Sequence, residues 1–188
     1  MADTYRAMID AYKELGRSYR LYWHLYGGWR AIFLSPYLHL AIVITAICSP
    51  IWLDGKKGAA IWADAAVNIL PNLMGFSIAG MAIFLAFSNS STLRAVTEGG
   101  EPESYFVATT ANFFHFILVQ TAALIVGFVG LHYSGRPLSF VGVLLLVYAL
   151  LVSPAMAMQL LHTARVINAA ESIVSKKSRN FKSAPKRD

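Results

Sequence analysis

The stretch AAVNILPNLMGFSIAGMAIFLAFS, residues 65–88, decides the fold class of this chain of 188 residues. It contains no Asp, Glu, Lys or Arg, and it is longer than the roughly 20 residues that a helix needs to cross a bilayer. Three similar uncharged stretches complete the set: Pro36 to Leu53, Phe106 to Leu131 and Pro137 to Leu161. The sequence therefore predicts an all-α polytopic membrane protein with four transmembrane helices.

The composition agrees with a chain that is mostly in lipid. Hydrophobic residues make up 56% of it and charged residues only 14%, against roughly one quarter charged in soluble domains. We expect residues 36–161 to form one four-helix transmembrane domain, because no segment outside this range is long enough for a second domain of ordinary size. Residues 1–35 and 162–188 are then appendages to it.

The N-terminal appendage has the pattern of an amphipathic helix. Between Thr4 and Tyr26, apolar and aromatic residues recur at steps of three and four, opposite a row of Lys and Arg residues. Such a pattern is typical of a helix that lies in the membrane interface. Gly27 and Gly28 should end it, and Pro36 suits the first turn of the next helix.

The C-terminal appendage continues the helical pattern beyond the fourth span, from Leu160 to Val174. We expect this cytosolic extension to bury its apolar face, either against the Thr4 to Tyr26 helix or against another subunit. From residue 175 the chain is polar and basic, which predicts a disordered tail. Its positive residues are candidates for contact with lipid or with a cytosolic protein: Lys176, Lys177, Arg179 and Lys182.

The distribution of positive charge predicts the topology. Five Lys or Arg residues precede the first span and seven follow the fourth, whereas the loops 54–64 and 132–136 together hold three. The positive-inside bias then places both termini in the cytoplasm and the chain in the cell (inner) membrane. Trp52 and Trp62, which flank the first of these loops, are expected at the outer interface.

The second span carries a stripe of polar and small residues at steps of three and four, which we call the α-stripe: Asp64, Asn68, Asn72, Gly75, Ala79, Ala82 and Ala86. Amides are costly in hydrocarbon without partners, so this edge should contact water or another helix. Two interpretations stay open. The stripe lines a pore, or its small residues only allow close helix packing.

The third span has a second polar-to-small stripe that includes Asn112 and Gln120. Either this stripe faces the first, with Asn72 and Gln120 bonded across the interior, or one of the two lines a cavity between subunits. Both arrangements make Asn112 and Gln120 candidates for a pore lining or an interface.

Several classes of function lack their residues. Cys48 is the single cysteine, the spans hold no carboxylate, and no GxSxG or HExxH motif occurs, so we expect no enzyme. His39, His115 and His162 show no ligand spacing, so we expect neither a metal nor another cofactor. The basic residues crowd at span ends, where a membrane surface explains them without nucleic acid.

Three hypotheses remain. The first is a homo-oligomeric ion channel whose second span lines a central conduit. The second is a non-conducting anchor or sensor whose termini recruit a cytosolic protein, as small subunits of bacterial defence or stress systems do. The third is an accessory subunit whose intramembrane amides pair with a larger transporter.

Overall fold

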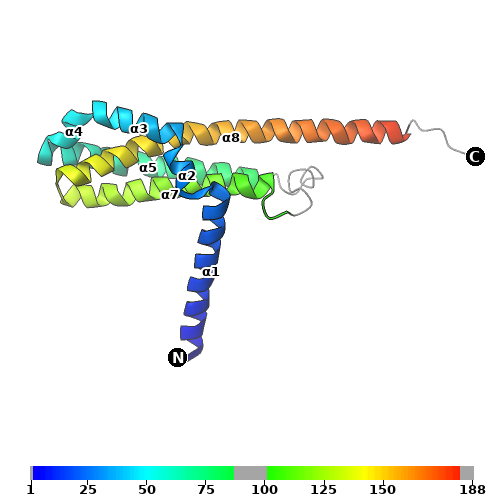
Figure 1. The fold of residues 1–188 in the computed structure, drawn as a ribbon, viewed down its shortest axis with the longest axis horizontal. Helices are drawn as coiled ribbons and strands as arrows, with labels where there is room; N and C mark the ends of the chain where they lie inside the picture. Colours follow the sequence, from blue (N-terminus) through cyan, green and yellow to red (C-terminus); the bar gives the residue numbers. More distant parts are fainter. Residues whose placement is uncertain (1, 87–100, 183–188) are drawn as a thin grey trace, which may run out of the picture.

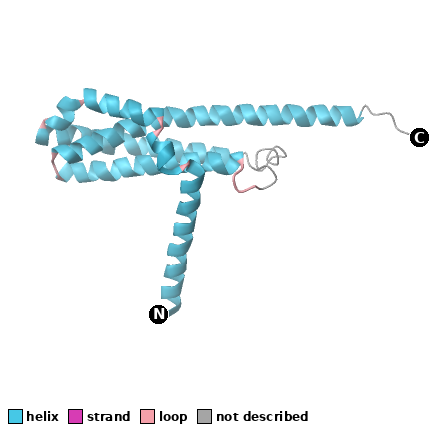
Figure 2. Cartoon of the chain, in the orientation of Figure 1, coloured by secondary structure: helices cyan, strands magenta, loops and turns pink. Residues whose placement is uncertain are grey.

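The computed structural model describes residues 2–86 and 101–182, and within these ranges every regular element is a helix (Figure 2). Three long helices form a bundle: α5 (Gly55–Ala86), α7 (Tyr105–His132) and α8 (Arg136–Lys182). Each contains a segment long and apolar enough to cross a membrane, namely Ile61–Ala86, Tyr105–His132 and Arg136–Ala169. The prediction of an all-helical chain is confirmed over the described ranges, and three of the four predicted spans have a continuous helix of sufficient length and apolar composition.

The two ends of the bundle differ. At one end, which we call the hairpin end, residues 133–135 join α7 to α8. At the other, the stem end, α8 leaves the bundle and continues alone (Figure 1).

The stretch predicted as the first span is broken in two. It forms α3 (Pro36–Ile47) and α4 (Ser49–Leu53), with Cys48 between them. Pro50 has no N–H to continue the hydrogen-bond ladder, which explains the break. At 1.5 Å per residue α3 is only about 18 Å long, against about 30 Å of hydrocarbon. A single continuous helix does not therefore cross here.

The pair nevertheless runs the length of the bundle. α3 begins beside α2 (Gly28–Phe33) and packs on α8, while α4 contacts the first part of α5 near the hairpin end (Figure 1). Trp52 of α4 packs against Phe140, with ring centroids 5.3 Å apart. The predicted loop 54–64 is wrong, because only Asp54 separates α4 from α5.

Trp62 anchors the hairpin end of the core. The residue is 2% exposed, and Gly130 of α7 and Gly142 of α8 leave the space that its ring fills. A Cβ atom at either glycine would overlap the indole. Trp62 therefore packs in an internal slot that the two glycines opposite it create, and its position at the outer interface stays a prediction.

α1 (Ala2–Tyr26) runs across the bundle rather than along it (Figure 1). Gly27 and Gly28, with φ of 92° and 60°, take left-handed conformations that other residues rarely adopt, and they turn the chain from α1 into α2 as predicted. Only the C-terminal part of α1 packs on α7, and its N-terminal part points away from the α8 extension. The predicted contact between α1 and residues 160–174 is not formed within the chain.

α8 is much longer than the bundle needs. It passes through Pro154 and continues to Lys182, so residues 175–182 are helical where a disordered tail was predicted. Beyond about Thr163, which is buried, the extension projects from the stem end without another of the described helices beside it (Figure 1). Residues 183–188 of the predicted tail, and residues 87–100 of the predicted loop between the second and third spans, lie outside the described residues.

Candidate functional site

The α-stripe faces outward from the chain. All seven of its side chains are exposed: Asp64, Asn68, Asn72, Gly75, Ala79, Ala82 and Ala86. The opposite face of α5 makes the contacts with α7 and α8, through buried residues such as Trp62, Leu70 and Phe84. Close packing of the stripe within one chain is therefore excluded as the reason for its small residues.

Gly75 makes this contrast concrete. A Cβ atom built on Gly75 meets nothing within 4 Å, so the single chain gives no steric reason for a glycine there. Gly127, by comparison, lies against Ala66, which a Cβ atom would approach to 2.9 Å. The inward glycine is explained by its neighbours and the outward one is not.

Over residues 2–86 and 101–182, the two amides of the stripe form hydrogen bonds only along their own helix. Asn68 Nδ2 donates to the carbonyl oxygen of Asp64 at 2.9 Å, and Asn72 Nδ2 donates to that of Asn68 at 3.4 Å. An amide can donate two hydrogen bonds and accept two. Both side chains therefore keep capacity for water or for another molecule.

Gln120 lies inside the bundle, and its hydrogen-bond partners differ from the predicted partner, Asn72. It is fully buried in α7, its Oε1 accepts from Ser77 Oγ at 2.9 Å, and its Nε2 donates to Ser153 Oγ at 3.3 Å. This polar layer connects α5, α7 and α8 across the core. A bond between Gln120 and Asn72 is absent, because Asn72 is on the other face of α5.

Asn112 occupies a third environment. It is half-buried at the stem end, where it lines a cavity of about 550 Å³ together with Tyr26, Tyr148, Gln159 and others. The sequence places Asn112 and Gln120 on one stripe, but the structure separates them. Neither lies beside the α-stripe.

An aromatic cluster around His115 was missed in the sequence. Tyr22 Oη lies 2.7 Å from His115 Nδ1, the ring of Tyr26 stacks on the imidazole with centroids 3.7 Å apart, and Tyr148 Oη is 3.5 Å from Nε2. These contacts hold the end of α1 on the bundle. The signal available was a lone histidine in an apolar helix and a tyrosine-rich segment 90 residues earlier, which no spacing rule connects.

Burial keeps the phenols of α1 neutral. It raises the pKa of Tyr22 from 10.0 to about 12, with a smaller contribution from Tyr19, and it raises the pKa of Tyr26 further. Both hydroxyls therefore remain available as hydrogen-bond donors at any physiological pH.

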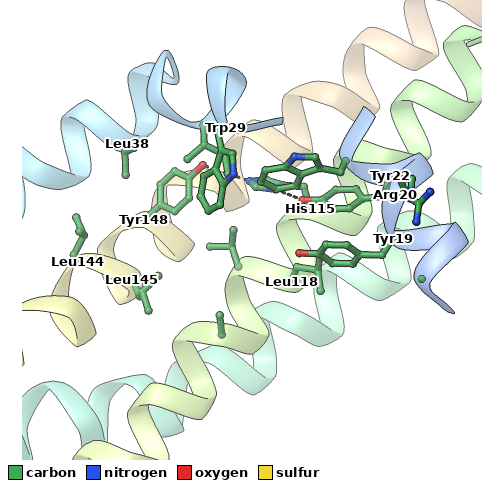
Figure 3. Close-up of a pocket in the computed structure, with 15 residues that line it drawn as sticks. Tyr19, Arg20, Tyr22, Trp29, Leu38, His115, Leu118, Leu144, Leu145 and Tyr148 are labelled. Atoms are coloured by element: carbon green, nitrogen blue, oxygen red, sulfur yellow. Dashed lines mark hydrogen bonds between the residues drawn. The ribbon is translucent and has the colours of Figure 1, made fainter. Parts of the chain in front are cut away.

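A large cavity lies next to this cluster and has a volume of about 870 Å³ (Figure 3). Residues of α1, α2, α3, α7 and α8 line it. Aromatic and polar groups, among them Tyr19, Arg20 and Trp29, gather at one end, and leucines such as Leu144 and Leu145 line the other. Its position is on the side of the bundle that carries α3, away from the α-stripe.

The basic residues of α8 are described only in part. Lys176 is exposed on the helical extension. The side chains of Lys177, Arg179 and Lys182 lie outside the described residues. Whether this group contacts lipid or protein stays a prediction.

The described ranges contain no cluster of side chains that could bind a metal ion. No three His, Cys, Asp or Glu side chains there could hold one ion. His39 and His162 are exposed at separate places, and His115 is occupied by Tyr22. What the arrangement can offer is an outward polar stripe, an inward polar layer and an apolar cavity.

No protein-family model, curated protein or solved structure matches the chain. What the protein does must therefore be argued from its own residues.

Proposed function

We propose that the protein is a homo-oligomeric ion channel of the cell inner membrane, in which α5 of each copy faces a shared central axis. The single observation that carries the proposal is the exposure of the α-stripe on a chain whose core is otherwise closed. Amides on the outer surface of a spanning helix need water or protein beside them. A ring of copies supplies both.

The conduit of this proposal lies between chains and not within one. The interior between α5, α7 and α8 is filled by the Trp62 slot, by Gln120 with its serines, and by Phe84, Phe113 and Met156. These layers leave no polar path along the bundle axis. Closed symmetry around α5 is then the arrangement that gives the α-stripe a function.

The order of residues along the stripe fits a conduit. Asp64 at the hairpin end would attract cations, and rings of Asn68 and Asn72 amides would replace part of the hydration shell of an ion. Further along, Gly75, Ala79 and Ala82 would form a narrow apolar segment that gates by dewetting. The proposed channel is therefore cation-selective at its outer mouth.

The orientation belongs to the same proposal. Both termini are cytoplasmic, the hairpin end is outside, and residues 36–53 provide the fourth crossing through α3 and α4 together. The positive-inside bias and the course of α3 and α4 from the stem end to the hairpin end support it.

Ion flux tests the channel directly. We expect the purified protein in liposomes to conduct, and Asn72→Leu to change conductance or selectivity because it removes one amide ring. Asn168→Leu is the matched control, since Asn168 is exposed on the α8 extension, far from α5. Flux no greater than that of empty liposomes would end the proposal, and so would equal effects of the two changes.

Stoichiometry tests the assembly. We expect a closed ring of copies in nanodiscs, and Gly75→Leu should dissociate it, because the leucine occupies the face that a neighbouring helix approaches. The open space around Gly75 in the single chain means that the fold itself should tolerate the change. A monomeric wild-type particle would contradict both the ring and the conduit.

One observation favours a second candidate, a non-conducting anchor that recruits a cytosolic protein. The α8 extension has half-buried or apolar positions such as Val166 and Ile167 but no neighbouring helix there. Removing residues 164–188 should abolish recruitment and leave the membrane bundle intact. If the full chain conducts ions and the truncated chain conducts equally, the extension is not needed for the channel.

A further inference from the structure

The lining of the large cavity beside α1 is polar at one end and apolar at the other. α7 runs from the stem end toward the hairpin end, so His115, Leu118 and Ala122 mark increasing depth along the wall. α8 runs the other way, and its Tyr148 lies at the depth of His115. The polar groups are thus at the stem end, and the aliphatic groups lie deeper in the bundle.

Most of the polar groups at that end already satisfy each other. The hydroxyl of Tyr22 and the ring of His115 are 2.7 Å apart, and Tyr148 lies at the other ring nitrogen. Arg20 is the positively charged residue among those that line the cavity. Over the described ranges no carboxylate lies within ion-pair distance of its guanidinium, whereas Arg17, one turn earlier, pairs with Glu14 at 3.4 Å.

The apolar face of α1 continues the cavity wall. Tyr5, Ile9, Tyr12, Gly16, Tyr19 and Trp23 follow steps of three and four, so they share the side of the helix that lines the cavity. Most of this face is exposed in the chain. Because α1 runs across the bundle axis, this face would lie on the membrane with Arg20 at its edge, at the level of lipid phosphates (Figure 1).

We propose that this cavity binds one anionic glycerophospholipid, with an acyl chain between α3, α7 and α8 and its phosphate at Arg20. The volume of about 870 Å³ is within the range of ligand cavities, and its apolar walls suit a hydrocarbon chain. The unpaired guanidinium at the mouth provides the charge that selects an anionic headgroup over a zwitterionic one. The inference needs the membrane setting but not the channel.

Quenching of tryptophan by brominated acyl chains tests the proposal in nanodiscs. Trp23 and Trp29 line the cavity, Trp52→Phe removes the half-buried tryptophan at the hairpin end, and the buried Trp62 remains as a constant background. We expect brominated phosphatidylglycerol to quench more strongly than brominated phosphatidylcholine at the same fraction. Arg20→Gln should lower this preference about fivefold, the effect of one positive residue at a lipid surface. Arg17→Gln, the matched control, should keep it.

A second pair of variants tests the acyl chain. Ala122→Phe fills the exposed apolar wall of the cavity, so quenching by both lipids should fall. Ala46→Phe places the same ring on an exposed position of α3 outside the cavity and should have no effect. Equal quenching by the two lipids in the wild type, a preference retained by Arg20→Gln, or quenching unchanged by Ala122→Phe would each overturn the proposal. So would an absence of quenching by either lipid, which would indicate that protein fills the cavity.

Discussion

At the scale of single residues, glycines divide this chain into an inner and an outer surface. Gly130 and Gly142 are needed where Trp62 inserts between helices, whereas Gly75 has open space around it. The same residue type thus serves packing within the chain at one place and, in our proposal, packing between chains at another.

Alanine substitutions separate these two uses. We expect Gly130→Ala to destabilise the bundle by about 1–3 kcal/mol, because the new methyl group overlaps the Trp62 ring. Gly75→Ala should leave the monomer as stable or more stable, since alanine favours helix by up to about 1 kcal/mol. Thermal unfolding in detergent, followed by near-ultraviolet circular dichroism, measures both. Equal stability losses would contradict the assignment.

The polar layer at Gln120 should matter less for stability than its burial suggests. In Gln120→Leu the single proton of Ser77 can go to the carbonyl of its own helix at 3.0 Å, and Ser153 keeps its bond to a carbonyl of its own helix at 2.9 Å, so neither hydroxyl is left without a partner. Hydrogen bonds between membrane helices average about 0.6 kcal/mol. We expect a loss below about 1 kcal/mol in the same unfolding experiment. A loss several times larger would show that the layer organises the fold.

The docking of α1 should weaken only in strong alkali. Free tyrosine has a pKa of 10.0, and docking raises the pKa of Tyr22 to about 12. Below pH 10 the phenol is neutral in both states and its contribution is complete. Between pH 10 and 12 the Tyr22 phenol loses its proton in the undocked state but keeps it in the docked state. The equilibrium constant for docking therefore falls by up to about tenfold per pH unit.

Spin-label distances from α1 to α7 measure this docking. Tyr22→Phe should flatten part of the alkaline transition, and the remainder belongs to Tyr26, whose pKa is raised in the same direction. Undocking between pH 7 and 9 would be inconsistent with these buried phenols.

At the scale of elements, the break at Cys48 replaces the predicted first span by two short helices. Charge content and length indicated a span, but neither quantity takes into account that Pro50 interrupts the backbone hydrogen bonds of the helix. The same limit applies to the start of α5, where polar residues 54–64 suggested a loop and the chain continues as helix.

Cysteine labelling determines whether residues 36–53 cross the membrane. In a Cys48→Ser background we expect Lys13→Cys and Asp54→Cys to react with an impermeant maleimide from opposite sides. Both parent side chains are exposed, so access should not limit the reaction. Lys176→Cys provides the reference for the cytoplasmic side and should behave like Lys13→Cys. Labelling of all three from one side would show that α3 and α4 enter and leave through the same surface.

At the scale of the whole molecule, the sequence predicts the helical class, three of the four expected apolar helices and the residues that share the α-stripe, because these depend on local charge and periodicity. It does not predict which small residues pack inward. Ala63 and Ala66 are buried while Ala79 and Ala82 are exposed, yet all four look alike in the sequence. The His115 cluster was beyond reach for a related reason, since it joins residues that only the three-dimensional arrangement brings together.

The length of α8 has a consequence for its lysines. At 1.5 Å per residue, Lys176 stands roughly 20 Å beyond Leu161 along the helix. Ionic screening at physiological salt acts over about 8 Å, so a charge held that far out feels little of the surface potential of the bilayer. With α8 upright in the membrane, its C-terminal end is therefore accessible to soluble macromolecules and lies too far from the lipid headgroups to interact strongly with them.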